Sequence, residues 1–204
     1  MTTNESFPKF DLPVDFIADD SITGDILNYY GNFPCKIKAG VFVLCTEGMV
    51  RATINLLEIV IRKNDFIVVL PNSFIQIHEV SSDTRISFAG FSSDFMLSGN
   101  YVEILLDFMP MILNSPVISL QEDVAGLYRN VYLLLIRAYT LPHSLENKEI
   151  IRSVLAIFLQ GTKELYKRYG KKLDEPLRRE QELYRQFIQL LMAHYTKELS
   201  LIHI

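Results

Sequence analysis

Few residues in this chain have the type and spacing that catalysis or metal binding requires. Its 204 residues include only four histidines, and only His78, which precedes Glu79, lies in a stretch typical of a β-strand. Metal sites built on β-strands need three or four nitrogen or oxygen ligands that converge from neighbouring strands. Adjacent strand residues point to opposite faces, so His78 and Glu79 share a site only if a β-bulge intervenes. The sequence therefore predicts no metal site and no cofactor.

Other signatures of enzymes are also missing from the sequence. It contains no GxSxG, no HExxH, no glycine-rich phosphate loop and no CxxC. The two cysteines, Cys35 and Cys45, fit no metal or redox spacing, and we expect reduced packing residues, with a disulfide between them as the alternative. We therefore expect no catalytic residues and a protein that is not an enzyme.

Polar residues in two predicted strands are the candidates for a ligand pocket. In SFIQIHEV, Gln76 and His78 share a face with Phe74 and Val80, whereas Ile75, Ile77 and Glu79 share the other. If Gln76 and His78 point inward, they are polar groups in an apolar cavity, which is the usual composition of a small-molecule site. Arg51 and Thr53 in MVRATIN pose the same question, and an inward Arg51 would favour an anionic or hydroxyl-rich ligand. The alternative is that all four side chains lie on the surface.

The segment that must position these residues is rich in β-type runs. Between residues 40 and 91, turn signals separate six short runs rich in Val, Ile, Phe and Thr: VFVLCT, MVRATIN, LEIVI, FIVVL, SFIQIHEV and RISFAGF. Their regular spacing predicts an antiparallel sandwich or a small barrel.

From residue 101 onward the apolar period becomes helical. We expect helices over residues 100–114, 119–141, 146–169 and 174–198. Ser119 followed by Glu122 is a capping-box signature, and Gly170 is typical of the residue after a helix. The fold class is therefore α+β, with an antiparallel β-barrel followed by helices that include an antiparallel pair.

The second and third predicted helices carry more apolar residues than one buried face requires. This surplus predicts that the helix pair packs against a second copy in a twofold dimer. The alternative is that both faces are buried within one subunit. The candidates for the dimer interface are Leu127, Val131, Leu134, Leu135, Val154, Leu155 and Phe158.

Composition indicates a folded protein with no membrane segment. Hydrophobic residues make up 49% of the chain and charged residues 22%, and the apolar runs are far shorter than a bilayer span. The start MTTNESFPKF lacks the features of a secretion signal, so we expect a cytoplasmic protein. The net charge of −4 combines an acidic N-terminal part with a basic C-terminal part. Because the basic residues alternate with acidic ones, we interpret them as a solvated helix surface that does not bind DNA specifically.

Two stretches resemble the AraC/XylS-type transcription regulators. RREQELYRQFIQLLMAHYTKE, residues 178–198, is similar to the linker helix that precedes the DNA-binding domain in that family. IRKNDFIVVLPNSFIQIHEV resembles the family's cupin stretch, with departures: Asn64-Asp65 replaces Gly-Asp, Asn72 replaces the Gly after Pro, and Ile75 stands where a His is usual. Because of these departures, no ligand contact is transferred from the family.

The resemblance implies a domain organisation. It implies an N-terminal arm and cupin-like barrel (double-stranded β-helix) over residues 1–98, a helical dimerisation region over 99–173 and a linker helix over 174–198. The final LSLIHI, residues 199–204, does not continue the family pattern and is interpreted as a non-native tail, left where the chain is cut before its helix-turn-helix domain.

The sequence thus predicts the effector-sensing and dimerisation part of an AraC-type regulator. Its expected partners are an unidentified small-molecule effector, a second copy of the chain and, through the missing domain only, DNA. The alternatives are a metal-dependent cupin enzyme and a metal-free small-molecule binding module unrelated to transcription.

Overall fold

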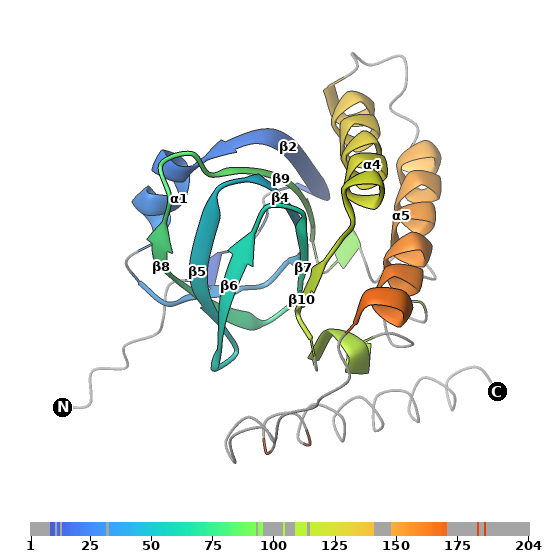
Figure 1. The fold of residues 1–204 in the computed structure, drawn as a ribbon. Coiled ribbons are helices and arrows are strands. Elements are labelled where there is room, and N and C mark those ends of the chain that lie inside the picture. The colour runs from blue at the N-terminus through green and yellow to red at the C-terminus, as the bar shows by residue number, and fades with distance from the viewer. Residues whose placement is uncertain are drawn as a thin grey trace.

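The computed structural model confirms the α+β class, with strands followed by two long helices (Figure 1). It describes residues 9–10, 12, 14–31, 33–92, 94–95, 104, 109–113, 115–140, 148–170, 183 and 186. Most of the predicted linker helix and all of the predicted tail lie outside these residues. Residues 109–113 are helical, within the first predicted helix.

In the described part of the chain, ten strands form two five-stranded sheets. Sheet A has the order β1 (Lys9–Phe10), β3 (Cys35–Ile37), β8 (Ser73–Val80), β5 (Met49–Ile54) and β6 (Leu57–Arg62). Sheet B has the order β10 (Val117–Ser119), β7 (Asp65–Val69), β4 (Gly40–Glu47), β9 (Arg85–Phe91) and β2 (Phe16–Thr23). All neighbours are antiparallel except β1 and β3. The six strands expected between residues 40 and 91 are therefore confirmed.

Tight turns connect the strands where the sequence supplies residues that tolerate a positive φ. Gly48 between β4 and β5 has φ 76°, and Asn64 and Asn72 each have φ 68°. Asparagine enters this left-handed region more readily than other residues with a side chain.

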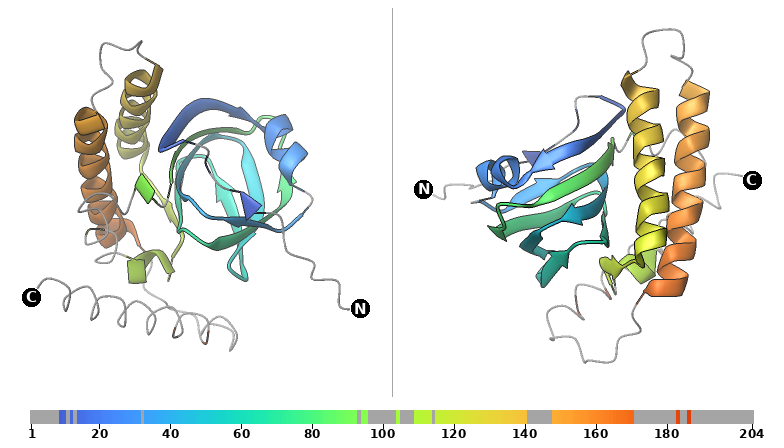
Figure 2. Two further views of the ribbon diagram at one scale, coloured as in Figure 1. Left: turned by 180° about the vertical axis from the view of Figure 1, so that it is seen from behind. Right: turned by 45° about the horizontal axis from the view of Figure 1, so that its top comes forward.

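The predicted closed barrel is not seen in the strand pairing. Within the described residues, every strand pair belongs to one sheet or the other, and the two sheets face each other. The strands of both sheets curve around a common axis in the views of Figures 1 and 2. The two-sheet sandwich, one of the two arrangements expected for these strands, therefore describes the observed pairing.

Sheet B separates two hydrophobic cores. Its strands alternate, so that Phe42 and Leu44 of β4 face the helices, and Cys45 faces sheet A. The core between sheet B and the helices is aromatic at its centre, where the ring centroid of Phe158 lies 5.0 Å from Phe42 and 5.5 Å from Tyr132. The core between the sheets is aliphatic apart from one cysteine. Its buried members are Cys45, Val50, Ala52, Ile54, Ile61, Ile67, Val69 and Ile86.

The helices cover one face of sheet B. α4 (Glu122–Thr140) and α5 (Lys148–Tyr169) run antiparallel on that side, and the short α1 (Gly24–Tyr30) packs against β8 and β2 (Figure 2). α5 ends before Gly170, whose N–H donates to the carbonyl of Tyr166, so the predicted helix end is confirmed.

The predicted capping box is wrong. Ser119 belongs to β10, and its hydroxyl donates to Oδ1 of Asp65 at 2.6 Å. The carboxylate of Glu122 instead accepts from Asn64 Nδ2 at 2.6 Å and pairs with Lys63 Nζ at 3.2 Å. The Ser119 hydroxyl therefore binds the buried carboxylate of Asp65 and does not cap the helix.

Candidate functional site

A β-bulge at His78 changes the faces of the last two residues of β8. Arg51 of β5 pairs with Glu79, whereas the next residue, Ala52, pairs with Ile77, so His78 is the extra residue. Beyond the bulge the alternation is reset, and Val80 joins Ile75 and Ile77 against the aliphatic core. The prediction that Val80 shares a face with Phe74 and Gln76 is therefore wrong.

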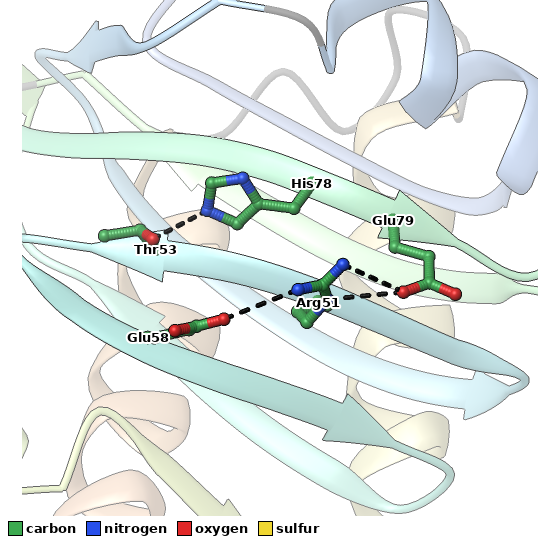
Figure 3. Close-up of polar contacts among 5 residues, drawn as sticks. All are labelled: Arg51, Thr53, Glu58, His78 and Glu79. Carbon is green, nitrogen blue, oxygen red and sulfur yellow. Dashed lines mark hydrogen bonds and ion pairs between the residues drawn. The ribbon is translucent and has the colours of Figure 1, made fainter.

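The bulge places His78 and Glu79 on the same outer face of sheet A, where both are exposed. Arg51 lies on this face between two carboxylates (Figure 3). Its Nε donates to Glu79 Oε2 at 3.2 Å, and its Nη1 lies 3.6 Å from Glu58 Oε1. These side chains are largely solvent-exposed, so each ion pair contributes little to stability.

Thr53 and His78 form a second pair on the outer face, with 2.7 Å between Thr53 Oγ1 and His78 Nε2 (Figure 3). Gln76 is the cross-strand partner of Thr53 and is half-buried on this face. The structure thus brings together the four pocket candidates, Arg51, Thr53, Gln76 and His78, but on the solvent side of sheet A. They do not line the space between the sheets.

The outer-face cluster lacks the features of a catalytic or metal centre. Arg51 is compensated by carboxylates, and the Thr53–His78 pair lies on an open sheet surface. In the described part of the chain, no three His, Cys, Asp or Glu side chains gather as metal ligands. The cluster is best explained as cross-strand pairing that stabilises sheet A.

The core between the sheets also includes aliphatic side chains that are only partly buried. On β4, the central strand of sheet B, Val41 and Val43 face this space and are half-buried. Their neighbours Phe42 and Leu44, which face the helices, are each 1% exposed. On sheet A, Ile75 and Ile77 of β8 also face the space and are half-buried. The core between the sheets is therefore less completely buried at β4 and β8 than the core beneath the helices.

The buried polar groups beside this space already have partners. Oδ2 of Asp65 accepts from the N–H of Arg62 at 2.7 Å, in addition to the bond from Ser119. Ser73 Oγ accepts from Asn55 Nδ2 at 3.0 Å, and Thr84 Oγ1 donates to the carbonyl of Met49 at 3.1 Å. These groups stabilise turns and strand ends.

Both cysteines are free thiols, in agreement with the expected reduced state. Burial, and to a lesser extent the nearby Asp65 carboxylate, raises the pKa of the Cys45 thiol to about 11. Its Sγ lies 3.2 Å from the carbonyl oxygen of Glu47. A thiol that stays protonated at neutral pH is a packing group and a poor nucleophile.

The structure divides the dimer-interface candidates into two groups. Leu135 and Leu155 are completely buried and Phe158 is 2% exposed, all in the core beneath the helices. The prediction that these three contact a second copy is wrong, because sheet B already covers them. Leu127 is 61% and Leu134 52% exposed, and Val131 and Val154 are half-buried.

The sequence left open whether the tyrosines on the apolar side of α4 are buried within one subunit, and the structure buries them together with Tyr166 of α5. The Tyr166 hydroxyl donates to the carbonyl of Pro116 at 3.0 Å. The Tyr132 hydroxyl is buried, and the described residues offer it no hydrogen-bond partner. Burial raises the pKa of Tyr132 well above its ordinary value. The signal available in the sequence was the spacing of Tyr128 and Tyr132, four residues apart on the apolar face of a helix.

Comparisons with known proteins give only distant similarity. No protein-family model matches the chain, and no curated protein matches it. A structure of ToxT from Vibrio cholerae aligns with 12% identity and a TM-score of 0.39, covering 80% of this chain and 60% of ToxT. The AraC-like transcriptional activator CuxR aligns with 10% identity and a TM-score of 0.42, covering 76% of this chain and 51% of CuxR.

A further ToxT structure, from strain SCE256 and bound to an unsaturated fatty acid, aligns with 10% identity and a TM-score of 0.41, covering 84% of this chain and 62% of ToxT. The chain thus spans about three fifths of the length of the ToxT structures. Similarity at this level assigns neither family nor ligand. Separately, no helix in the described ranges is long and apolar enough to cross a membrane.

Proposed function

We propose that this chain is the effector-sensing and dimerisation part of an AraC-type transcription regulator that acts in the cytoplasm. The observation that carries the proposal is the two-sided environment of β4. One side of this strand packs tightly against the helices, and the other side is half-buried and faces the aliphatic core between the sheets. A ligand between the sheets would therefore lie one strand away from the helix layer. The resemblance of residues 178–198 to the family's linker helix supports the same function.

The proposal keeps the cupin-like description of the strands. Strands from distant parts of the sequence alternate between two facing sheets, as a double-stranded β-helix requires. The domain boundaries, residues 1–98, 99–173 and 174–198, are retained as part of the proposal. DNA contact is assigned to a helix-turn-helix domain that is not among these residues.

A hydrogen-bonded junction offers a route from the space between the sheets to the helices. The turn between β6 and β7 contacts the start of α4 through Asn64 and Lys63, which both bind the Glu122 carboxylate. The N–H of Leu120 also donates to the carbonyl of Asn64 at 3.0 Å. A ligand that moves β7 would move this junction, and a coupling of about 1–3 kcal/mol changes an affinity by one to two orders of magnitude.

The exposed side of α4 has the pattern of a coiled-coil seam. Apolar residues recur at alternating spacings of three and four residues, at Val124, Leu127, Val131, Leu134 and Ala138. This heptad spacing positions a stripe along one side of a helix that a second helix can cover. Leu127 and Leu134 are mostly exposed in the single chain. A second copy of the chain, packed on this stripe, would bury them.

Charged residues beside the stripe favour an antiparallel dimer. Asp123, Asn130 and Arg137 are exposed and lie seven residues apart, so they flank the stripe on one side. In an antiparallel pair with twofold symmetry, Asp123 faces Arg137 of the partner subunit, and the reverse contact forms at the other end. In a parallel twofold pair, Asp123 of one subunit and Arg137 of the other would lie at opposite ends, so this attraction would be absent.

A repressor-fusion assay tests this function. The chain is fused to a DNA-binding reporter domain that represses transcription only as a dimer. We expect repression, and we expect Leu127→Asp or Leu134→Asp to reduce it at least tenfold. Ile157→Asp is the matched control, because Ile157 of α5 is 68% exposed but lies outside the α4 stripe. The absence of repression by the unmodified fusion would rule out the dimeric regulator.

A further inference from the structure

We infer that the edge strand β6 pairs with β6 of a second copy of this chain, antiparallel across a twofold axis at Val60. The two copies of sheet A then form one continuous sheet. This contact goes beyond the proposed function, because it uses the edge of sheet A and not the stripe on α4.

Four strands lie at the edges of the two sheets in the described part of the chain, namely β1, β6, β10 and β2. β1 has only two residues and β10 only three. β2 packs against α4, and its register shifts between Asp19 and Ile22, where Asp19 Oδ1 accepts from the N–H of Ser21. Short length, cover and irregular pairing all protect a strand edge. β6, by contrast, has six residues and pairs with β5 without a register shift.

The turn between β5 and β6 determines where the backbone groups of β6 point. Asn55 and Leu56 form this two-residue turn with φ 48° and 72°, so the flanking pair, Ile54 and Leu57, is a hydrogen-bonded pair. Hydrogen-bonded and non-hydrogen-bonded pairs alternate along an antiparallel ladder. Every second residue of β6 after Leu57 therefore directs its N–H and C=O groups away from β5.

These outward-pointing groups belong to Glu58, Val60 and Arg62. The N–H of Arg62 agrees with this geometry, because it donates to Asp65 Oδ2 at 2.7 Å and not to β5. The outward N–H and C=O groups of Glu58 and Val60 have no hydrogen-bond partner among the described residues. A second strand can pair with them. Two hydrogen bonds form at Val60 and one at each end, and Arg62 keeps its bond to Asp65.

The side chains of β6 complement a second copy of the strand. With Val60 on the axis, Glu58 faces Arg62 of the partner subunit, and the reverse contact forms at the other end. On the opposite face of the strand, Ile59 lies beside Ile61 of the partner subunit. Moving the centre by two residues would place Glu58 opposite Glu58, or Arg62 opposite Arg62, and like charges directly opposite each other are destabilising. The sequence of β6 therefore favours this antiparallel register.

The outer face of β6 is accessible in the single chain. Val60 is 37% exposed, and the side chain of Glu58 is 66% exposed. Glu58 Oε1 also lies 3.6 Å from Arg51 Nη1 on the neighbouring strand (Figure 3). In the pair, Glu58 lies between Arg51 and Arg62 of the partner subunit, so the second copy adds a cation and displaces none.

Analytical ultracentrifugation of a Leu127→Asp/Leu134→Asp chain tests the inference, because the two charges remove the α4 stripe from the measurement. We expect a monomer–dimer equilibrium that ends at the dimer, since a twofold pair leaves no β6 edge open. A chain that stays monomeric up to about 1 mM, the weak end of specific association, would overturn the inference. Association that continues beyond the dimer would also overturn it, because it would indicate open-ended edge aggregation. The outcome is independent of the repressor-fusion assay.

Two variants of Val60 in the same chain test the backbone pairing. Val60→Pro removes the N–H at the axis, and proline is tolerated at an edge position whose N–H bonds nothing within the subunit. Loss of two hydrogen bonds across the axis is expected to weaken the dimer at least tenfold. The matched control, Val60→Thr, keeps the N–H and the β-branched shape and is expected to stay within about threefold of the parent. Equal effects of the two variants would overturn the inference.

Charge variants test the register and leave the backbone of β6 unchanged. Glu58→Arg and Arg62→Glu are each expected to weaken the dimer at least fivefold, because each creates repulsion at both ends of the pair. The double variant restores opposite charges and should recover most of the affinity. If Glu58 pairs only with Arg51 of its own subunit, the single variants leave association unchanged. That result would overturn the inference even where Val60→Pro fails to fold.

Discussion

Two tyrosines in the core beneath the helices differ in a single hydrogen bond. Tyr132 and Tyr166 are both almost completely buried, but within the described residues only the Tyr166 hydroxyl has a hydrogen-bond partner, the carbonyl of Pro116. A buried hydroxyl without a partner keeps the cost of leaving water, whereas a bonded one recovers it. The two side chains should therefore respond oppositely to loss of the hydroxyl.

We expect Tyr132→Phe to raise the free energy of unfolding by about 1 kcal/mol and Tyr166→Phe to lower it by about 1 kcal/mol. Tyr132→Phe removes a desolvated group at nearly constant volume, and Tyr166→Phe removes a hydrogen bond. Urea denaturation with equal m-values measures both. If the two variants shift stability in the same direction, the difference between the hydroxyl environments is not as described.

The Cys45 thiol gives a pH-dependent prediction. Its pKa in the folded protein is about 11, raised from an ordinary value of 9.0 mainly by burial. The unfolded chain therefore loses the thiol proton at a lower pH than the folded chain. The contribution of Cys45 to the free energy of unfolding is fully present below pH 9 and is lost as the pH rises towards 11. We expect Cys45→Ala to reduce this decline in urea titrations at pH 8, 9 and 10. An identical decline in both proteins would show that other groups cause it.

At the scale of elements, local patterns predicted strand positions better than strand faces. The runs between residues 40 and 91 alternate and end at turn residues, so their positions follow from periodicity. The bulge at His78 has no compositional signature, yet it turned Glu79 to the outer face beside His78 and Val80 to the inner face. One inserted residue therefore changed the faces of Glu79 and Val80, whereas the four pocket candidates lie on the outer face by ordinary alternation.

Elements with weak sequence signals were missed for similar reasons. β2 (Phe16–Thr23) contains the polar stretch ADDS at a register shift, and β10 is three residues long. Their place at the two edges of sheet B comes from long-range pairing with β9 and β7. Ser119 likewise has the spacing of a helix cap, but its hydroxyl binds a residue 54 positions away. Local sequence patterns cannot predict such long-range contacts.

Two glycines in different elements should respond oppositely to alanine. Gly48 has φ 76°, and an added Cβ would lie 2.5 Å from Thr84 Cα, so Gly48→Ala combines strain with a clash. Gly126 is inside α4 with nothing within 4 Å of its added Cβ. We expect Gly48→Ala to destabilise the protein by more than about 2 kcal/mol and Gly126→Ala to stabilise it by about 0.5–1 kcal/mol.

Thermal unfolding monitored by circular dichroism measures both glycine variants. Because α4 is a helix before any association, the Gly126 result also tests whether the exposed side of the helix tolerates a methyl group. A destabilised Gly126→Ala chain would indicate a close contact at that position in solution.

At the scale of the whole molecule, the surplus apolar residues of the two long helices divide into a buried group and an exposed group. The sequence showed more apolar residues on the two long helices than one face needs, and could not separate burial within a subunit from burial between subunits. The position of sheet B separates them: Leu135, Leu155 and Phe158 are covered, and Leu127 and Leu134 are not. The helical period of the apolar residues alone does not predict which of them are covered, because the covering depends on the position of sheet B.

The charges that flank the exposed stripe lead to a prediction about self-association. If Asp123 faces Arg137 of the partner subunit, reversing one charge creates repulsion at both ends of the pair, and reversing both restores attraction. We expect Asp123→Arg and Arg137→Asp each to weaken dimerisation about tenfold in analytical ultracentrifugation, and the double variant to recover most of it. The weakening should fade at high salt, because these side chains are exposed.

A cysteine variant tests the same register without changing charge. Asn130 lies midway between Asp123 and Arg137, so in the antiparallel register it faces Asn130 of the partner subunit across the twofold axis. Asn130→Cys should form an intersubunit disulfide on mild oxidation, whereas Gly126→Cys, displaced from the stripe, should not. In a parallel pair, each single charge reversal would exchange one pair of like charges for another and leave association nearly unchanged. Unchanged association of both single variants would therefore overturn the antiparallel register even if the protein is dimeric.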